Sequence, residues 1–105
     1  MAFGLQEEII KRINLVLAAH SGVDEAVIYG SRAKESHRAG SDIDLTLKGS
    51  ELNLQTINKI SRELDDLLLP YSFDLSIYNQ IENQDLLDHI KRVGKVFYRK
   101  TSPTR

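Results

Sequence analysis

Three aspartates in this chain have the residue type and spacing that suit metal-assisted chemistry. Asp42 and Asp44 are two residues apart in a segment that alternates between polar and apolar residues, and Asp74 lies in a second alternating segment. Side chains two apart in a strand point to the same face, so Asp42 and Asp44 are predicted neighbours. If both segments bury their apolar faces against the same helices, Asp74 lies on that face as well. We therefore expect three carboxylates to share one open surface.

The charge on such a cluster indicates what it binds. Carboxylates held close together repel one another, which raises their pKa values or destabilises the site unless a cation neutralises the charge. Mg²⁺ prefers carboxylate oxygens combined with substrate phosphates, and two such ions about 3.5 to 4 Å apart can assist an in-line phosphoryl or nucleotidyl displacement. The three aspartates therefore predict a divalent-cation site for this kind of displacement, and the chemistry needs no histidine.

A glycine turn earlier in the chain is a candidate phosphate site. Gly30 and Ser31 follow the short apolar segment 26–29, which is typical of a buried strand, and Ser31 can begin a short helical turn that runs to Glu35. A glycine lets the backbone approach an anion closely, and backbone amides at the start of a helix point toward it. Arg32 is the basic side chain nearest the turn. We consider it as a phosphate ligand, with a solvated arginine as the alternative.

The elements that must position these residues follow from hydrophobic periodicity. Helical spacing occurs in segments 5–17, 54–67 and 86–93, and strand-like alternation occurs in segments 42–47 and 73–78. This order predicts a small α/β (α+β) domain with a mixed sheet of three or four strands, helices on one face and an open active-site face. Residues 1–98 form the predicted domain. Residues 99–105, which include Pro103 and no apolar anchor, form a predicted mobile C-terminal tail.

Composition limits the classes of protein to which the chain can belong. It has 105 residues, no cysteine, a formal net charge of -1 at pH 7 and a pI near 6.3. We expect one domain, without a disulfide, a thiolate zinc site or a cysteine nucleophile. The charge balance provides no general attraction to nucleic acid or anionic lipid, so neither is an expected direct partner. The longest apolar run, residues 15–19, is too short to cross a bilayer and no signal segment is visible, so we expect a cytoplasmic protein.

Taken together, the motifs resemble a known family. The turn Gly30-Ser31-Arg32-Ala33, the strand Gly40-Ser41-Asp42-Ile43-Asp44-Leu45 and the later Asp74 are similar to the signature of the minimal nucleotidyltransferases of the DNA polymerase beta-like superfamily. That signature has a Gly-Ser turn, a spacer of about ten residues, an Asp-x-Asp strand and a third aspartate on a following strand. The resemblance covers nearly the whole chain, and the core motif shows no departure from it.

The resemblance implies a role for each residue of the motif. Gly30 and Ser31 would hold the nucleotide phosphates, Asp42 and Asp44 would ligate two Mg²⁺ ions, with Mn²⁺ as the alternative, and Asp74 would bind the catalytic metal and help to deprotonate the acceptor hydroxyl. The family transfers a nucleoside monophosphate, commonly AMP from ATP, and releases pyrophosphate. Its minimal members pair with a helical-bundle protein of the HEPN type, often as antitoxin and toxin, and some adenylylate a tyrosine of that partner.

Other interpretations remain open at this stage. Larger relatives carry an acceptor-binding domain for which this chain has no room, so we expect a partner to complete the site. The chain could instead be a catalytically weak nucleotide-binding module that neutralises its partner by complex formation, or a transferase acting on a small molecule or an RNA end. His20 and His89, like the tyrosines, are predicted to pack at the boundary between core and water, and His37 is predicted to be an exposed loop residue.

Overall fold

The computed structural model describes residues 2–35 and 42–100 of the chain. The elements occur in the order α1 (Glu7–Ala18), β1 (Glu25–Tyr29), β2 (Ile43–Lys48), α2 (Leu54–Asp65), β3 (Phe73–Ile77), the 3-10 turn η1 (Tyr78–Gln80), α3 (Gln84–Val93) and β4 (Lys95–Arg99). The helices and strands predicted from periodicity are therefore confirmed. None of the described helices is long and apolar enough to cross a membrane.

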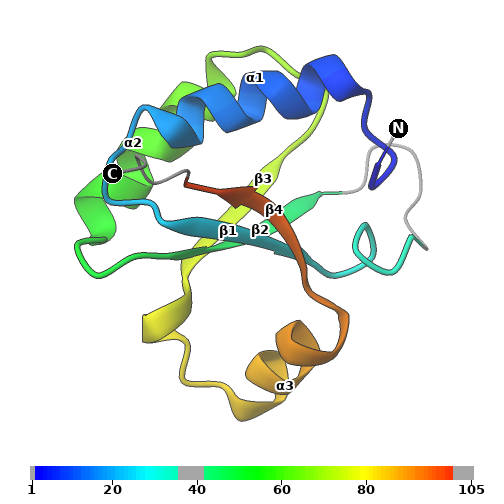
Figure 1. Ribbon diagram of the computed structural model, residues 1–105, viewed down its shortest axis with the longest axis vertical. Coiled ribbons are helices and arrows are strands. Elements are labelled where there is room, and N and C mark those ends of the chain that lie inside the picture. Colours follow the sequence, from blue (N-terminus) through cyan, green and yellow to red (C-terminus); the bar gives the residue numbers. More distant parts are fainter. Residues whose placement is uncertain (1, 36–41, 101–105) are drawn as a thin grey trace, which may run out of the picture.

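The four strands form one mixed sheet in the order β3-β2-β1-β4 (Figure 1). Strand β1 is antiparallel to both of its neighbours, β2 and β4, whereas β2 and β3 run parallel. A parallel pair needs a crossover, which α2 supplies between β2 and β3. This fold class, a small nucleotidyltransferase-like α/β domain with a mixed sheet, is the one that the sequence predicts.

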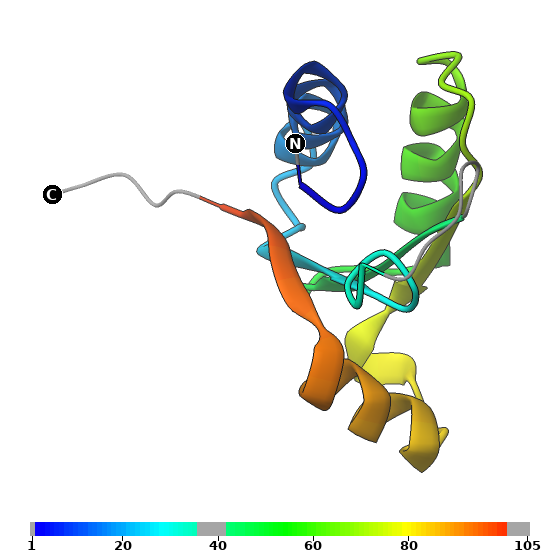
Figure 2. The ribbon, with the colours of Figure 1, turned by 90° about the vertical axis from the view of Figure 1, so that its right-hand side faces the viewer.

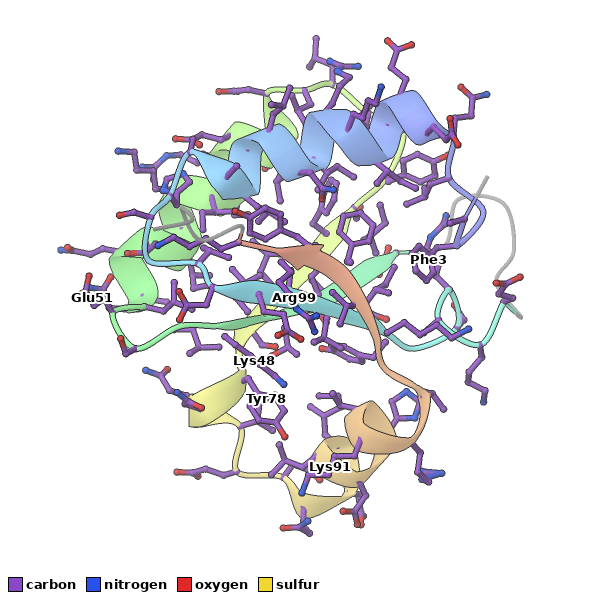
Figure 3. The ribbon with its side chains drawn as sticks, viewed as in Figure 1. Phe3, Lys48, Glu51, Tyr78, Lys91 and Arg99 are labelled. Carbon is purple, nitrogen blue, oxygen red and sulfur yellow. The ribbon has the colours of Figure 1, made fainter. Side chains whose placement is uncertain are left out.

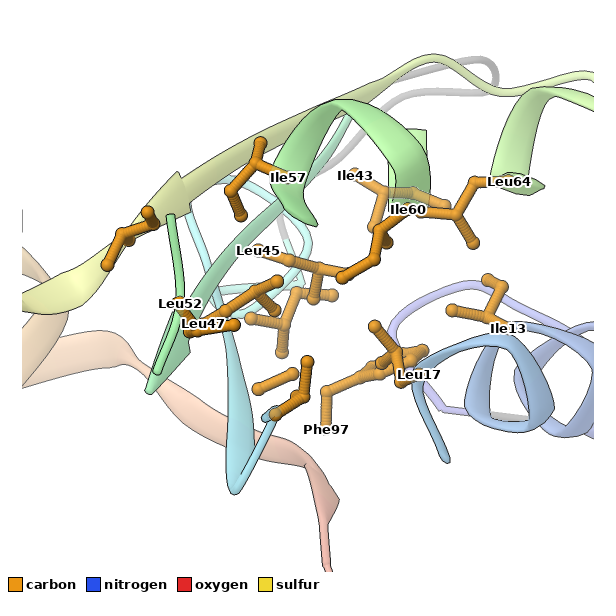
Figure 4. Packing of buried hydrophobic residues seen from close by; sticks show 14 of the residues in the cluster. Ile13, Leu17, Ile43, Leu45, Leu47, Leu52, Ile57, Ile60, Leu64 and Phe97 are labelled. Atoms are coloured by element: carbon orange, nitrogen blue, oxygen red, sulfur yellow. The ribbon is translucent and has the colours of Figure 1, made fainter. Parts of the chain in front are cut away.

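The main core lies between one face of the sheet and the helices α1 and α2, which Figure 2 shows side by side on that face. Ile28 of β1 and Leu45 of β2 are opposite each other in the sheet and are fully buried, together with Leu17 of α1 and Ile60 of α2 (Figure 4). Strand β4 adds Phe97 to the same core. Burying a side chain of this kind contributes about 1.5 to 3 kcal/mol, so this cluster is the main source of stability.

Helix α3 lies on the opposite face of the sheet, which corrects the expectation that all helices share one face (Figure 2). Val27 and Tyr29 alternate with the core residues of β1 and point away from them, and Ile90 of α3 packs on both. Strand β1 is therefore apolar on both faces, as suits a central strand. The Lys48 ammonium at the end of β2 lies 4.6 Å from the centroid of the Tyr78 ring (Figure 3). This cation–π contact joins β2 to η1.

The ends of the described elements are held by specific hydrogen bonds. The side chain of Asn83 accepts from the Leu86 N–H and caps α3. Arg99 lies in β4, and the backbone N–H of Lys100 donates to the Asp24 carbonyl at 2.8 Å. Strand β4 therefore includes Arg99, the first residue of the predicted tail. Residues 101–105 of the predicted tail lie outside the described part of the chain.

Candidate active site

The acid cluster predicted from the sequence lies on the face of the sheet that also carries α3. Asp44 of β2 and Asp74 of β3 are direct partners in the parallel register, so their side chains leave neighbouring strands side by side on one face. Tyr29 of β1 is the antiparallel partner of Asp44, which places a phenol in the same row. Asp42 stands just before β2, two residues from Asp44, and is exposed like Asp74. The shared face expected for the three aspartates is therefore present. We call Asp42, Asp44 and Asp74, together with Tyr29, the acid row.

The pKa of Asp44 reflects its burial and the carboxylates around it. The pKa of Asp44 is raised above its ordinary value of 3.8, first by burial, then by the negative charge of Asp74 and then by that of Asp42. Each of these causes disfavours the ionised carboxylate. The face therefore carries concentrated negative charge that a bound cation would relieve.

Tyr29 is affected by the same charges. Burial raises the pKa of its phenol, the nearby Ser76 hydroxyl lowers it, and the carboxylates of Asp74 and Asp44 raise it again. Ser76 Oγ itself is buried and makes no hydrogen bond of good geometry, so its influence on Tyr29 is one of proximity. Tyr29 was predicted to be boundary packing, and at 8% exposure it is instead an internal member of the acid row.

The predicted phosphate turn begins where β1 ends, directly beside Asp44. Gly30 has φ +77°, a left-handed conformation that favours glycine. A Cβ at this position would overlap Asp44 Oδ2 and lie 3.4 Å from Asp44 Cγ, so the absence of a side chain lets the backbone touch the carboxylate. The turn is closed by the Lys34 N–H, which donates to the Gly30 carbonyl at 3.2 Å. The chain thus joins the Gly-Ser turn to the acid row by direct contact.

The segment after Ser31 is a series of turns rather than the predicted short helix. Glu35 has φ +58°, which ends any helical course after a single turn. The helix start expected for phosphate binding is therefore lacking in the described residues 30–35, and a phosphate here would bind individual backbone and hydroxyl groups. His37, Gly40 and Ser41 belong to the sequence motif or its basic spacer but lie outside the described residues.

Arg32 is buried, which corrects the solvated arginine that we considered as the alternative to a phosphate ligand. Its side chain is only 2% exposed, one guanidinium nitrogen donates to the Phe3 carbonyl at 2.8 Å, and the guanidinium carbon lies 4.9 Å from the centroid of the Tyr71 ring. A stacked and hydrogen-bonded arginine of this kind holds segments together. Here it ties the turn to the N-terminal segment that carries Phe3. The role of Arg32 as a phosphate ligand stays a prediction.

His89 of α3 is a feature of the site that sequence reasoning missed. Its Nε2 accepts the backbone N–H of Gly30 at 3.2 Å, and its ring meets the Tyr29 ring edge-on with centroids 6.2 Å apart. The only signal in the sequence was the position of His89 beside the apolar stripe of its helix, which predicts partial burial and no partner. The contact spans 59 positions of the chain and depends on which face of the sheet α3 covers.

The donor set for a metal ion is composed of carboxylate oxygens. Among the residues that the structure describes, no group of three or more histidine, aspartate or glutamate side chains is arranged to hold a metal ion by itself. Asp44 and Asp74 are nevertheless direct partners on neighbouring strands, and the pKa of Asp44 is raised by burial and then by the negative charge of Asp74. Mg²⁺ is commonly bound by one or two carboxylates together with substrate phosphates and water, so this pair fits a metal that arrives with a nucleotide.

Fold and site together define a domain of the nucleotidyltransferase class. The family described as Polymerase beta, Nucleotidyltransferase matches residues 11–102, which include every described element except the start of α1. The chain therefore belongs to this family. No curated protein matches the sequence significantly.

Several solved structures share the fold. A toxin-antitoxin complex with AMP-PNP is 17% identical, with a TM-score of 0.69 over 92% of this chain and 76% of that one. A complex of the MNT antitoxin with the tri-AMPylated HEPN toxin of Shewanella oneidensis is 16% identical, with a TM-score of 0.68 over 91% and 74% of the two chains. The toxin-antitoxin MntA-HepT is also 16% identical, with a TM-score of 0.68 over 90% and 74%. Identities this low show a common fold.

Proposed function

We propose that this protein is a metal-dependent nucleotidyltransferase that transfers AMP from ATP to a hydroxyl group of a partner protein. Family membership supports nucleotidyl transfer in general. The observation that carries the proposal for this chain is the pairing of Asp44 with Asp74 across parallel strands, with Asp42 on the same face and the Gly30 turn in contact with Asp44. A site for nucleotidyl transfer needs oxygen ligands for metal and a turn that binds phosphate, and the contact between the Gly30 turn and Asp44 supports such a site here.

The role of each residue follows from its place in the row. Asp42 and Asp44 would hold Mg²⁺, or Mn²⁺, together with the nucleotide phosphates, and Asp74 would complete the set from the neighbouring strand. The bound ions would neutralise the charge that develops on the phosphates and on the departing pyrophosphate. Gly30 and Ser31 would position the phosphates, since backbone here can approach within contact distance of Asp44. Asp74 is exposed and would accept the proton of the incoming acceptor hydroxyl.

The proposed acceptor is a HEPN-type helical-bundle protein, with this chain as the antitoxin half of the pair. Solved complexes that share the fold contain such a partner, and in one of them the HEPN toxin is AMPylated. An apolar surface of this chain also supports a protein partner. Leu15 of α1 is 70% exposed and lies between two hollows of about 440 and 430 Å³, one of which is lined by Phe97 and Tyr98 and the other by Val16 and Leu67.

The test is intact-mass spectrometry of a HEPN-type protein encoded beside this chain after incubation with ATP, Mg²⁺ and this protein. We expect a gain of one or more AMP units, which Asp44→Asn and Asp74→Asn abolish. Asp65→Asn is the matched control because Asp65 is an exposed acid at the end of α2, on the other face of the sheet. An unmodified partner that still forms a stable complex would overturn the transferase proposal and favour the neutralising module.

A further inference from the structure

His89 contacts two consecutive residues at the junction between β1 and the phosphate turn. Its Nε2 accepts the Gly30 N–H at 3.2 Å, and its ring packs edge-on against Tyr29 at an interplanar angle of 80°. The next residue of α3, Ile90, is buried against Tyr29 and Val27. The imidazole therefore belongs to a helix that packs on β1, and β1 ends at Tyr29, directly before Gly30.

The hydrogen bond fixes the chemical form of the ring. Because a backbone N–H donates to Nε2, that nitrogen must carry a lone pair, and the single proton of the neutral imidazole then lies on Nδ1. A glycine at φ +77° is an intrinsically permissive position, since it lacks the steric limits of other residues. An acceptor that binds its N–H therefore selects one orientation of a peptide plane that would otherwise rotate easily.

That orientation matters because the other side of Gly30 touches the acid row. The Gly30 backbone lies against Asp44, so the peptide is enclosed by a carboxylate on one side and by an imidazole on the other. A rotation of the Tyr29–Gly30 peptide plane would change the φ angle of Gly30, on which the shape of the turn beside Asp44 depends.

We propose that His89 is a positioning residue, which holds the Gly30–Ser31 turn against Asp44 and thereby sets where the nucleotide phosphates lie relative to the acid row. The effect on nucleotide binding rests on the proposed function, whereas the effect on the turn does not. Helix α3 thus becomes part of the nucleotide site without touching the nucleotide, and its contribution should be to the affinity for ATP.

The competing explanation is that His89 only fills space between α3 and β1. Leucine would fill that space but cannot accept a hydrogen bond, whereas the amide oxygen of glutamine can occupy nearly the same place as Nε2. His89→Leu and His89→Gln therefore separate packing from positioning. His20→Leu is the matched control, since His20 is also half-buried and also bonded through Nε2, but to Glu63 between α1 and α2.

The first measurement is amide hydrogen exchange of Gly30 in ¹⁵N-labelled protein. We expect exchange to be about tenfold faster in His89→Leu, the factor for one lost hydrogen bond, and close to wild type in His89→Gln and His20→Leu. The KM for ATP should rise by about the same factor in His89→Leu and recover in His89→Gln, with kcat changing less. The proposal would be overturned if Gly30 exchanged at the same rate in the wild type and in all three variants. It would also be overturned if His89→Leu had the same KM for ATP as His89→Gln.

A measurement on the unmodified protein keeps the test valid if His89→Leu does not fold. Nuclear magnetic resonance should show His89 with a proton on Nδ1 and a coupling through the hydrogen bond between Gly30 ¹⁵N and His89 Nε2. Absence of that coupling would refute the contact. If the wild-type protein transfers no AMP but Gly30 exchange responds to His89 as expected, the proposed function fails while the positioning of the turn stands.

Discussion

Replacing Gly30 by alanine should destabilise the protein by about 2 to 4 kcal/mol, from two causes that can be separated. The first is conformational: at φ +77° a residue with a Cβ is disfavoured by about 1 to 2 kcal/mol. The second is steric, since the new methyl group would overlap Asp44 Oδ2. Moving that carboxylate away from its preferred rotamer, or shifting the backbone, costs about 1 to 2 kcal/mol more.

The steric part should vanish when the carboxylate is removed. In an Asp44→Ala background, the nearest remaining Asp44 atom to the new methyl group is Cβ at 3.7 Å, which is an ordinary van der Waals contact. Gly30→Ala should then cost only about 1 to 2 kcal/mol, the conformational part. The coupling between the two substitutions should be about 1 to 2 kcal/mol, which is typical of residues in contact.

Urea unfolding of the wild type, the two single variants and the double variant measures this coupling directly. Gly22→Ala is the matched control, because a Cβ at Gly22 would meet nothing closer than 3.8 Å. It should change stability by less than about 0.5 kcal/mol. An equal cost of Gly30→Ala in both backgrounds would show that the glycine does not touch Asp44. A cost no greater than that of Gly22→Ala would refute the left-handed turn as well.

Three further predictions concern charge, a buried arginine and a helix cap. Because the pKa of Asp44 is raised above 3.8, the folded state holds its proton more tightly, so without metal the free energy of unfolding should fall as pH rises through this pKa. Asp44→Asn should lack this fall in a series of urea titrations, and an identical pH profile would contradict the raised pKa. Arg32→Ala should cost about 2 to 4 kcal/mol through its lost hydrogen bond and its contact with Tyr71, and Arg32→Lys should not restore it. Thermal unfolding tests this, and an unchanged midpoint would show that the side chain is not buried. Asn83→Ala should cost about 1 kcal/mol and Asn83→Asp much less, because only the alanine variant leaves the Leu86 N–H without its cap; equal stabilities of the two variants would contradict this.

The acid row could be predicted from the sequence because strand periodicity is a local property. Alternation fixes which residues of 42–47 and 73–78 share a face, and the apolar residues fix which face is buried. Asp42, Asp44 and Asp74 followed from those two facts alone. The cap at Asn83 is local in the same sense, since it depends only on the residues of the first helical turn.

The placement of α3 could not be predicted in the same way. Its stripe of apolar residues shows that one side of the helix is buried, but either face of the sheet could cover it. The sequence does contain one indication. Val27 and Tyr29 are apolar or aromatic, like Ala26 and Ile28 of the alternating core positions, so β1 needs cover on both faces. His89 was interpreted as packing for the same reason, since its partner is defined only once α3 has been placed.

Arg32 shows a different limit of sequence reasoning. A basic residue beside a glycine turn resembles a phosphate ligand, and its charge predicts exposure. The Phe3 carbonyl and the Tyr71 ring both contact the guanidinium and favour its burial. These partners lie 29 and 39 positions away in the chain, so no local pattern reveals them.

The position of β3 at one end of the sheet has a consequence for how firmly the acids are held. Among the described strands, β2 is flanked by two neighbours, whereas β3 is hydrogen-bonded to β2 alone. Asp44 is therefore fixed from both sides, while Asp74 is attached to the interior through a single ladder, across which their two charges repel. A cation bound by both residues would cross-link the edge strand β3 to the interior strand β2. Because a ligand stabilises the state that binds it, loss of the cation would favour fraying of β3, and fraying of β3 would weaken binding of the cation.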